Sequence, residues 1–424
     1  MKTRIFIYNL LTTTAIAVAS MMMSACSNDD DNVTPHKQEA KPLVVDEAQK
    51  TIIAAHNKFA HNFFAYALKA ANGDNVAVSP LSAEIALSML ANAADGETQT
   101  ELLNVLGYSD MTALNSFNRY MLENLPMVDP SLVRLDLCNS VWLNSDWNVS
   151  LTPAFTNTLD SDYSASVTSL PFSNFNINIK ANEWVDEKTQ GMINKFYEED
   201  EDLSRLNFSL LNAMYFNGKW NENCKFDKKK TEPADFTYTD ESGTKATKKV
   251  EMMTTMYTGF GCEKPGEYKA VKLYYGQNAF YMLIVVPEDG QDINYCMSNA
   301  MNVKAPDVYW QPYRLTLKLP RFENEATIQM TPFLIDAGID MERCNLSNVL
   351  SDGKPVIDEQ IFIKQCTAIK VYEEGTEAAA VTGIDGVGAT LIYPLTVTAD
   401  RPFGYAIVEK ESNTIIMMGA FQKP

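Results

Sequence analysis

Residues 373–390 read Glu-Glu-Gly-Thr-Glu-Ala-Ala-Ala-Val-Thr-Gly-Ile-Asp-Gly-Val-Gly-Ala-Thr and join two apolar stretches that are predicted to be β-strands. A connection of this length between two strands is unusual, and long connections in compact domains are often functional. Taken alternately, one set of side chains, beginning at Thr376, has no charge, whereas the other contains Glu377 and Asp385. A strand with one buried face shows this alternation. The segment therefore has the pattern of a half-buried strand at a place where a loop is expected.

Outside this segment, helical patterns dominate early in the chain and strand patterns dominate late. Helices are predicted at about 46–72, 83–94, 98–106 (with Thr98 as the N-cap), 180–197 and 331–337. Strands are predicted at 132–143, 208–217, 269–275, 279–286, 313–319, 361–372, 391–398, 403–409 and 413–420, and a short apolar stretch lies at 76–78. Helices and strands do not alternate as in a parallel α/β fold, and no linker or repeat follows residue 45. We therefore expect one large α+β domain.

Charge and histidine content exclude several classes of function. Lys+Arg 35 against Asp+Glu 54 give a net charge of -19, which argues against nucleic-acid binding because phosphate neutralisation needs a basic surface. All three histidines, His36, His56 and His61, lie near the N-terminus. Residues 62–424 therefore supply no histidine for a Ser/His/Asp or Cys/His pair or for a metal site. We expect no enzyme activity, no cofactor and no metal.

The N-terminus has the pattern of an export signal. Two basic residues precede an apolar run over residues 5–23, and small residues precede Cys26. This is typical of a secretory signal rather than a membrane span. The cysteine resembles that of a bacterial lipobox, where it would be diacylated and become the first mature residue; an ordinary signal peptide is the alternative. We predict a lipoprotein signal at 1–25, a flexible acidic tether at 26–45 and the folded domain at 46–424.

An acidic run, Asp29-Asp30-Asp31, follows Cys26 closely. It is similar to the surface-export signal of Bacteroidota lipoproteins. We expect an exported outer-membrane lipoprotein, at the cell surface or on the periplasmic side. The six other cysteines are scattered without a C-x-x-C pair, which favours buried free thiols over disulfides.

A series of motifs, in order along residues 48–424, resembles the serpin family. The matching segments are Asn75-Val76-Ala77-Val78-Ser79-Pro80-Leu81-Ser82, Gly96-Glu97-Thr98-Gln99-Thr100, Asn182-x-Trp184-Val185 with Thr189-x-Gly191-x-Ile193, Leu211-Asn212-Ala213-Met214-Tyr215-Phe216-Asn217-Gly218-Lys219-Trp220, Glu373-Glu374-Gly375-Thr376-Glu377-Ala378-Ala379-Ala380, Ala399-Asp400-Arg401-Pro402-Phe403 and Met418-Gly419. The run over 211–220 is the most specific. The resemblance implies the serpin fold, a single large domain with three β-sheets, about nine helices and an exposed reactive-centre loop at about 373–398.

The resemblance also implies a suicide-substrate inhibitor of serine proteases. A protease attacks the loop and forms an acyl-enzyme, and the cut loop then inserts into the main sheet and drags the protease to the far pole. Extended, residues 376–389 would reach about 46 Å, close to the diameter of order 50 Å expected for a domain of this size. The translocation is therefore geometrically possible.

The hinge, which the resemblance places at residues 373–380, has the composition that insertion requires. Thr376, Ala378, Ala380 and Thr382 are small and uncharged on the face that would be buried, where a charge would be heavily penalised. Three later glycines, at 383, 386 and 388, lower strand stability and favour some turnover of the protein as a plain substrate.

The family's usual register places the bait bond between Ala389 and Thr390. The preceding Val387 and Gly388 suggest an elastase-like protease with a small apolar pocket. Leu391 and Tyr393 remain alternatives for chymotrypsin-like enzymes, although Pro394 after Tyr393 disfavours the latter. No basic residue lies between Lys370 and Arg401, which argues against trypsin-like targets.

By motif match, Ser79, Ser82 and Asn212 fall at the family's shutter, which controls sheet opening, and Trp220 falls at the breach, where insertion begins. Gln365 replaces the shutter histidine of many animal serpins. Because glutamine both donates and accepts hydrogen bonds, this network can survive the replacement.

The partners expected are a serine protease and, through Cys26, a lipid membrane, with no nucleic acid, and we expect a monomer. The alternative is a non-inhibitory, surface-anchored protein of the same fold that binds a ligand. A stable covalent complex with a protease, or a large gain in thermal stability after loop cleavage, distinguishes the two.

Overall fold

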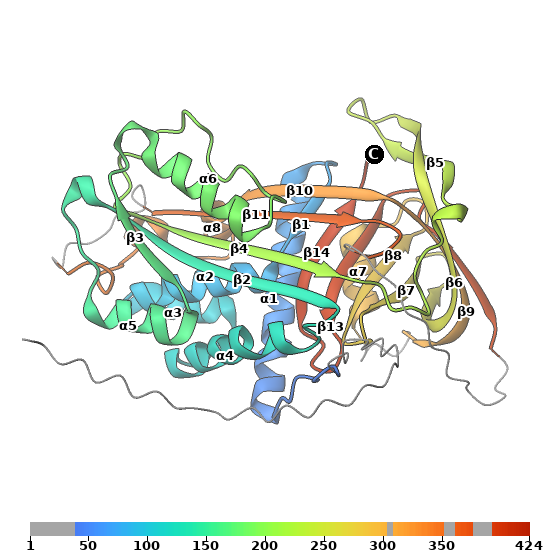
Figure 1. The fold of residues 1–424 in the computed structure, drawn as a ribbon, viewed down its shortest axis with the longest axis horizontal. Coiled ribbons are helices and arrows are strands. Elements are labelled where there is room, and N and C mark those ends of the chain that lie inside the picture. The colour runs from blue at the N-terminus through green and yellow to red at the C-terminus, as the bar shows by residue number, and fades with distance from the viewer. Residues whose placement is uncertain (1–38, 303–307, 352–360, 376–391) are drawn as a thin grey trace, which may run out of the picture. The chain divides into compact units, whose positions relative to one another are not determined.

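The computed structural model describes residues 39–302, 308–351, 361–375 and 392–424 (Figure 1). Its eight α-helices within these residues are α1 Glu47–Ala71, α2 Pro80–Ala93, α3 Gly96–Leu106, α4 Met111–Asn124, α5 Pro153–Tyr163, α6 Asn176–Lys188, α7 Ile293–Met301 and α8 Thr331–Asp336. Most begin at a side chain that accepts a hydrogen bond from the first turn: Asp46, Ser79, Asp95, Asp110, Thr152 and Asp292.

The main sheet has five strands in the order β10-β11-β4-β2-β3. They are β10 Phe322–Gln329, β11 Ile361–Val371, β4 Phe208–Gly218, β2 Val133–Asn144 and β3 Ser166–Leu170. The central pair, β11 and β4, is parallel, whereas β10 and β2 run antiparallel to their central neighbours. We call this the five-stranded sheet.

The remaining strands form a nine-stranded sheet in the order β1-β14-β13-β8-β7-β6-β9-β12, with β5 also paired to β6. Their bounds are β1 Val76–Val78, β14 Ile415–Phe421, β13 Phe403–Glu409, β8 Phe280–Pro287, β7 Tyr268–Tyr275, β6 Lys245–Lys264, β9 Gln311–Pro320, β12 Pro394–Thr398 and β5 Glu232–Thr239. The 20-residue β6 pairs with β5 and β9 along most of its length and with β7 at its end. The resemblance implied three separate sheets. Because β6 joins two of them, the described strands form two sheets.

The five-stranded sheet is covered on both faces. The main core packs α1 to α5 and the nine-stranded sheet against one face, through residues such as Met214, Phe216 and Ile369. A smaller core packs α6 and the segment after it against the other face, through residues such as Leu211 and Ala368. Figure 1 shows α6 over the sheet with α2 to α5 on the opposite side. The expected α+β class is confirmed.

Three helix boundaries differ from the sequence-based expectations. The helix predicted over 83–94 begins at Pro80, because Ser79 is its N-cap. The helix predicted over 98–106 begins at Gly96, because Asp95 rather than Thr98 is its N-cap and Thr98 is buried. The helix predicted over 180–197 ends at Lys188, because Gln190 and Gly191 have left-handed φ values of 54° and 77°. The chain then folds back over the sheet, where Phe196 and Tyr197 are buried.

The residues just before α1 are packed on the body. The Lys41 N–H donates to the Val128 carbonyl at 2.7 Å, and Leu43 is buried. The expected tether is therefore fixed at its C-terminal end. None of the helices within the described residues is long and apolar enough to cross a bilayer.

Candidate functional site

The candidate site is the central parallel pair of the five-stranded sheet, which is closed at one end and open at the other. Ladder pairing runs from Ile361 opposite Phe208 to Gln365 opposite Asn212. Both strands continue further, to Val371 and Gly218. Within these fully described stretches, no ladder pair joins residues 366–371 to residues 213–218. We call the two parts the closed half and the open half.

Gln365 fastens the closed half to the helix layer. Its Oε1 accepts from the Ser79 N–H at 3.0 Å, and its Nε2 donates to the Ser79 carbonyl at 2.8 Å. The Ser79 hydroxyl in turn donates to the Ile416 carbonyl of β14 at 2.9 Å and accepts from the Ser82 N–H at 3.1 Å. All of these polar groups lie on buried residues. The glutamine therefore satisfies both backbone groups of Ser79 at the start of α2.

Asn212 extends the same buried row towards β2. Its Nδ2 donates to the Asn139 Oδ1 at 2.6 Å, and Asn139 in turn donates to the Tyr163 carbonyl at the end of α5. The shutter residues predicted from the sequence, Ser79, Ser82, Asn212 and Gln365, thus lie together behind and within the closed half. Ser82 contributes only its backbone N–H to the hydrogen bonds described here.

His56 supports this region from α1. Its Nε2 bonds to the Ile415 carbonyl at 2.8 Å, next to the carbonyl that Ser79 uses, and its Nδ1 bonds to Glu84 of α2. Burial alone would lower the pKa of His56, but the charge and hydrogen bond of Glu84 and the bond to Ile415 raise it above its usual value. Tyr108 donates to the other carboxylate oxygen of Glu84 at 2.5 Å.

Trp220 lies at the mouth of the open half, just after the end of β4. It is 3% exposed, its ring stacks on Tyr275 with centroids 4.3 Å apart, and its Nε1 donates to the Tyr372 carbonyl at 2.8 Å. Its backbone N–H donates to the Glu374 carbonyl at 3.3 Å. The predicted breach residue therefore connects the end of β4 with the chain that leaves β11.

Gly375 is wedged at the mouth of the open half. It forms isolated antiparallel bridges with Lys219, just after β4, and with Tyr372, just after β11. Its φ is 111°, and a Cβ there would lie 2.6 Å from the Trp220 nitrogen and 2.7 Å from the Lys219 Cα. Both the conformation and the space therefore require glycine.

The two glutamates before Gly375 differ in their surroundings. Glu373 is buried, accepting from Arg321 at 2.6 Å and from Thr231 at 2.7 Å. Burial would raise its pKa, but these donors outweigh that effect and hold the pKa below its usual value. Glu374 is partly exposed and pairs with Lys228 of the short helix η4 (Lys228–Lys230) at 2.5 Å. The carbonyls of both residues also accept hydrogen bonds, from Phe226 and Trp220.

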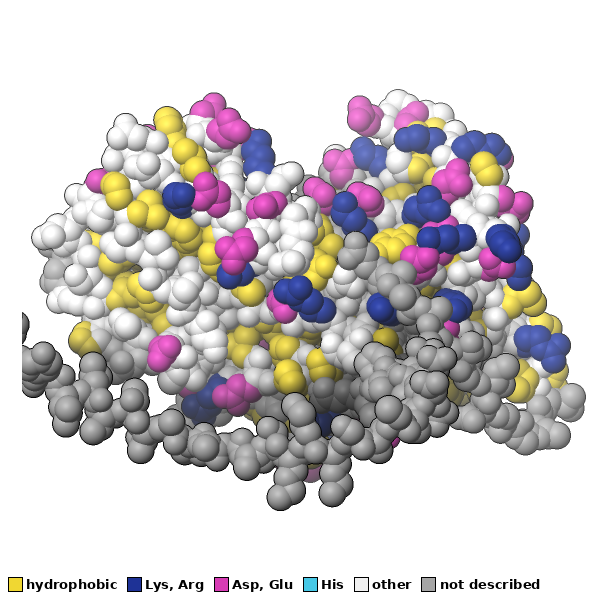
Figure 2. Space-filling view, in the orientation of Figure 1, with side chains coloured by type: hydrophobic (Ala, Val, Ile, Leu, Met, Phe, Trp, Pro, Cys, Tyr) yellow, Lys and Arg dark blue, Asp and Glu magenta, His cyan; other side chains and the backbone are white. Residues whose placement is uncertain are grey.

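A groove of about 930 Å³ lies over the open half on the α6 side. The residues that line it include Arg134, Tyr215, Asn217, Lys219, Lys370 and Tyr372. In Figure 2 the surface is notched between the regions of α6 and β5, and basic and acidic side chains lie on both sides of the notch.

Part of the predicted site lies outside the described residues. These residues are Thr376, Glu377, Ala378, Ala379 and Ala380 of the hinge, the bait residues Ala389 and Thr390, the alternative Leu391, and the lipidation residue Cys26. Tyr393 is described: it is 65% exposed, and its carbonyl accepts from the Arg314 N–H at 2.9 Å.

Sequence reasoning missed several residues that hold the site together. These are Tyr275, Arg321, Thr231 and Asn139, which contact the predicted residues from 52 to 142 positions away in the chain, from Arg321 with Glu373 to Thr231 with Glu373. No local pattern indicates such partners. Among the described residues no group of His, Cys, Asp and Glu side chains forms a metal site, and none of the six described cysteines is in a disulfide.

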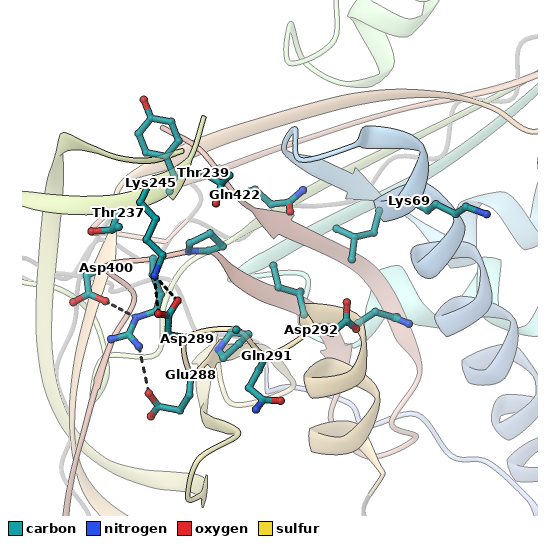
Figure 3. A pocket seen from close by; sticks show the side chains of 18 of the residues that line it. Lys69, Thr237, Thr239, Lys245, Glu288, Asp289, Gln291, Asp292, Asp400 and Gln422 are labelled. Atoms are coloured by element: carbon teal, nitrogen blue, oxygen red, sulfur yellow. Dashed lines mark hydrogen bonds and ion pairs between the residues drawn. The ribbon is translucent and has the colours of Figure 1, made fainter. Parts of the chain in front are cut away.

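A second pocket, of about 770 Å³, lies between α1, the turn before α7 and the β5–β6 hairpin (Figure 3). Lys245 pairs with Asp289 at 2.6 Å, and Arg401 pairs with Asp400 at 3.0 Å and with Glu288 at 3.3 Å. Figure 3 shows these pairs together on one side of the pocket, with Lys69 of α1 across from them. Apolar residues, including Leu68 and Ile293, complete the lining.

Comparisons with known proteins agree with this architecture. A family model described as Serpin (serine protease inhibitor) matches residues 54–424. Mouse neuroserpin is 24% identical over 380 residues, covering 83% of this chain and 86% of that protein. A serpin-like protein of Thermococcus kodakarensis is 29% identical over 399 residues, covering 90% and 88%. Human thyroxine-binding globulin, solved in complex with thyroxine, superposes with a TM-score of 0.75 at 22% identity, covering 89% and 99%.

Proposed function

We propose, from the premise that the chain belongs to the serpin family, that this protein is a suicide-substrate inhibitor of serine-type endopeptidases. The family is one of serine protease inhibitors in general rather than of enzymes. The finer proposal is that a cut loop enters the five-stranded sheet and traps the acyl-enzyme before hydrolysis.

The observation that supports this proposal is the half-open parallel pair with Gly375 at its mouth. The two parallel strands are paired at residues 361–365 and 208–212 and have no ladder at residues 366–371 and 213–218. A third strand, antiparallel to both, can enter between them there. Gly375 already bridges both strands at the open end. The chain that follows it would need no new turn before entering the gap.

The covering of the open half is compatible with such an addition. Side chains of Met214, Phe216 and Ile369 form the core-side surface of the gap. An entering strand with Thr376, Ala378 and Ala380 on that face would bury small uncharged groups against them. The free energy for dragging a protease would come from this burial and from new ladder hydrogen bonds.

The proposed target is an elastase-like serine protease, with Ala389–Thr390 as the bait bond and chymotrypsin-like cleavage at Leu391 or Tyr393 as the alternative. The support is the small apolar sequence Val387-Gly388-Ala389. Incubating the purified protein with pancreatic or neutrophil elastase should give an SDS-stable band at the summed mass, and mass spectrometry should locate the cut after Ala389. Clean cleavage without a complex, by elastase and by several other serine proteases, would overturn the proposal.

We further propose that Cys26 is lipidated and that the protein is an exported outer-membrane lipoprotein of the Bacteroidota type, displayed at the cell surface. Such a location suggests that it shields the envelope from host or competitor proteases. Labelling with a fatty-acid analogue should mark the wild type and not Cys26→Ser. Deletion of the gene without a change in protease sensitivity would count against the shielding role.

The pocket in Figure 3 favours a second candidate function, ligand binding by a non-inhibitory protein of the same fold. Its volume of about 770 Å³ is in the range of small-molecule sites. Thyroxine-binding globulin, of the same fold, is solved with thyroxine bound. Ligand binding without any protease complex, and without a gain in thermal stability after loop cleavage, would favour this second function.

A further inference from the structure

Strand β14 contains a β-bulge close to the point where its pairing with β1 ends. The ladder between β13 and β14 shifts by one residue after Ile407, so that Ile416 is skipped. On the other edge of β14, β1 pairs only as far as Met418. Successive carbonyls of a regular strand point to opposite sides, and a bulge disturbs this alternation. Here the carbonyls of Ile415 and Ile416 both accept hydrogen bonds from the helix layer.

Three side chains of the helix layer hold this bulge. The Ser79 hydroxyl, at the start of α2, donates to the Ile416 carbonyl at 2.9 Å. From α1, the His56 Nε2 bonds to the Ile415 carbonyl at 2.8 Å, and the Asn57 Oδ1 accepts from the Ile415 N–H at 3.1 Å. The acceptor of the Ser79 hydroxyl is therefore fixed next to a residue that α1 holds through both of its backbone polar groups.

The contacts of His56 require an additional proton. The Ile415 carbonyl can only accept, so Nε2 must donate to it. Nδ1 faces one oxygen of Glu84, whose other oxygen accepts from Tyr108, so a second proton must lie between the ring and this carboxylate. A neutral imidazole has only one N–H. The buried pair thus holds one proton more than a neutral imidazole beside a carboxylate.

The groups around His56 leave it as the one that titrates near neutral pH. Glu84 faces it from α2, and the Ile415 carbonyl faces it from β14; both raise the pKa of His56 against the effect of burial. Tyr108, after α3, and Tyr163, in α5, lie around Glu84. Burial, and the charge of Glu84, raise the pKa of both tyrosines, so both keep their protons.

Loss of the proton would break the bond to β14. The remaining N–H would stay with the Glu84 carboxylate, which is a stronger acceptor than a carbonyl. Nε2 would then face the Ile415 carbonyl with a lone pair, and these two acceptors repel each other.

We propose that protonated His56 is a positioning residue for Ser79: it holds the β14 bulge to which the Ser79 hydroxyl donates, and it releases the bulge when it loses its proton. Both side-chain hydrogen bonds of Gln365 end on the backbone of Ser79, so a less firmly held Ser79 means a closed half that opens more easily. The bulge is fully held below pH 6.5 and is released as the pH rises through the raised pKa of His56. The consequence for loop insertion rests on the proposed function, whereas the positioning itself does not.

Two measurements on the purified protein, without a protease, test the positioning. The chain has three histidines, so nitrogen-15 NMR of the imidazoles should show both ring nitrogens of His56 protonated at pH 6.5 and one proton lost at higher pH. Amide exchange of Ser79, corrected for its intrinsic pH dependence, should accelerate about two- to tenfold between pH 6.5 and pH 9, the factor that corresponds to one net hydrogen bond. A single ring proton on His56 at pH 6.5, or an exchange rate that does not change, would overturn the inference.

His56→Gln and Glu84→Gln should each remove the pH dependence, and His61→Gln is the matched control. The first change removes the imidazole, and the second leaves it neutral over this range of pH. His61 is also in α1, but it contacts Ser298 of α7, and burial lowers its pKa to about 4. His61→Gln should therefore keep the wild-type transition in Ser79 exchange. A transition that persists unchanged in His56→Gln would contradict the proposal.

Tyr108→Phe is a milder variant that keeps both buried charges, in case their replacement prevents folding. The Tyr108 hydroxyl stabilises the Glu84 carboxylate, so its removal strengthens the hold of the pair on the shared proton. The midpoint of the transition should move to higher pH. A midpoint that stays in place or falls would show that the pair does not control the exchange of Ser79.

The protease reaction separates this inference from the proposed function. With pancreatic elastase, the ratio of SDS-stable complex to cleaved free inhibitor should rise from pH 6.5 to pH 9 in the wild type relative to His56→Gln, a comparison that cancels the pH dependence of the protease itself. If the complex forms but both proteins change alike, His56 does not position the shutter, although the protein inhibits. If no complex forms while Ser79 exchange shows the expected transition, the proposed function fails and the positioning stands.

Discussion

The closed and open halves of the β4–β11 pair belong to the same two strands but differ in the hydrogen bonds that hold them. In the closed half, Gln365 and Ser79 exchange two buried hydrogen bonds that continue to β14 and, through Asn212 in the same row, to β2. In the open half, no ladder joins the described strands, and Trp220, Glu373 and Gly375 hold the mouth. Buried polar networks favour one arrangement of the elements they join, and in this network only the buried Asn212 Oδ1 is without a hydrogen-bond partner among the side-chain atoms named here. On the proposed mechanism, insertion would begin in the open half, at the hinge, and would end in the closed half.

The ladder of the closed half bears on the proposed insertion. A strand entering between β4 and β11 would have to separate residues 361–365 from residues 208–212, which are paired. We therefore expect the network of Gln365 to act on the later stage of insertion.

The largest expected effect tests the mouth of the open half. Trp220→Ala should lower the free energy of unfolding by about 3–5 kcal/mol, because it empties a buried site and removes the stacking on Tyr275 and the bond to the Tyr372 carbonyl. Denaturant unfolding measures this loss. The matched control is Trp147→Ala, since Trp147 is 48% exposed and also donates to a carbonyl, that of Ser204. Equal losses from both changes would mean that the mouth is not a point of special stability.

The next effect tests the closed half. Gln365→Ala should lower the free energy of unfolding by about 2–4 kcal/mol, because it empties part of a buried site and leaves the buried Ser79 N–H without its partner, whereas the Ser79 carbonyl keeps the bond from the Ala83 N–H. Gln329→Ala, at an exposed position on the adjacent strand β10, is the control and should change the free energy of unfolding by less than about 0.5 kcal/mol. A loss below about 1 kcal/mol for Gln365→Ala would show that the hydrogen bonds of Gln365 do not make the closed half more stable than the open half.

A smaller effect distinguishes the two hinge glutamates. Glu373→Ala should cost about 1.5–3 kcal/mol, since Arg321 and Thr231 lose a buried charged acceptor. Glu374→Ala removes only the partly exposed pair with Lys228 and should cost no more than about 1 kcal/mol. Thermal unfolding of both variants, with limited proteolysis near residue 375, checks the difference. Equal losses of thermal stability and equal rates of proteolysis in the two variants would show that Glu373 does not hold the hinge in place.

The smallest expected effect is a pH dependence of the free energy of unfolding, caused by His56 and His61 of α1. The raised pKa of His56 means that its stabilisation is fully present below the unfolded value near 6.5 and is lost as the pH rises through the folded-state pKa. Burial lowers the pKa of His61 to about 4, so its contribution falls as the pH drops below 6.5. Each slope is at most about 1.4 kcal/mol per pH unit, the value for one proton.

Unfolding free energies measured from pH 5 to pH 9 separate the two histidines. His56→Gln should flatten the limb above pH 6.5 and His61→Gln the limb below it. If His56→Gln still loses unfolding free energy above pH 6.5 as the wild type does, the imidazole between Glu84 and Ile415 is not the titrating group.

Much of the fold could be predicted from local patterns. Apolar spacing located α1, α2 and strands such as β2, β4 and β11, because buried faces repeat with the period of the element. The longest strand, β6, was not predicted. Helices α4, α5 and α7 were missed although Asp110, Thr152 and Asp292 cap them, so their N-caps were an available signal. The end of α6 was misplaced because left-handed φ at Gln190, a non-glycine residue, is not foreseeable from its side chain.

By itself, the sequence determined the serpin family, the α+β class, the small uncharged face of the loop and the order of the hinge residues, because these depend on local composition and on motifs in sequence order. Only the tertiary structure decided that the β4–β11 pair closes over five residues, that Arg321 and Thr231 hold Glu373, and that Gly375 lies in register with both strands. Apart from the bridge between Gly375 and Tyr372, these contacts join residues 52 to 156 positions apart in the chain, from the Arg321–Glu373 pair to the Lys219–Gly375 bridge. Partners at such separations are selected by packing of the whole domain, and no local pattern encodes them.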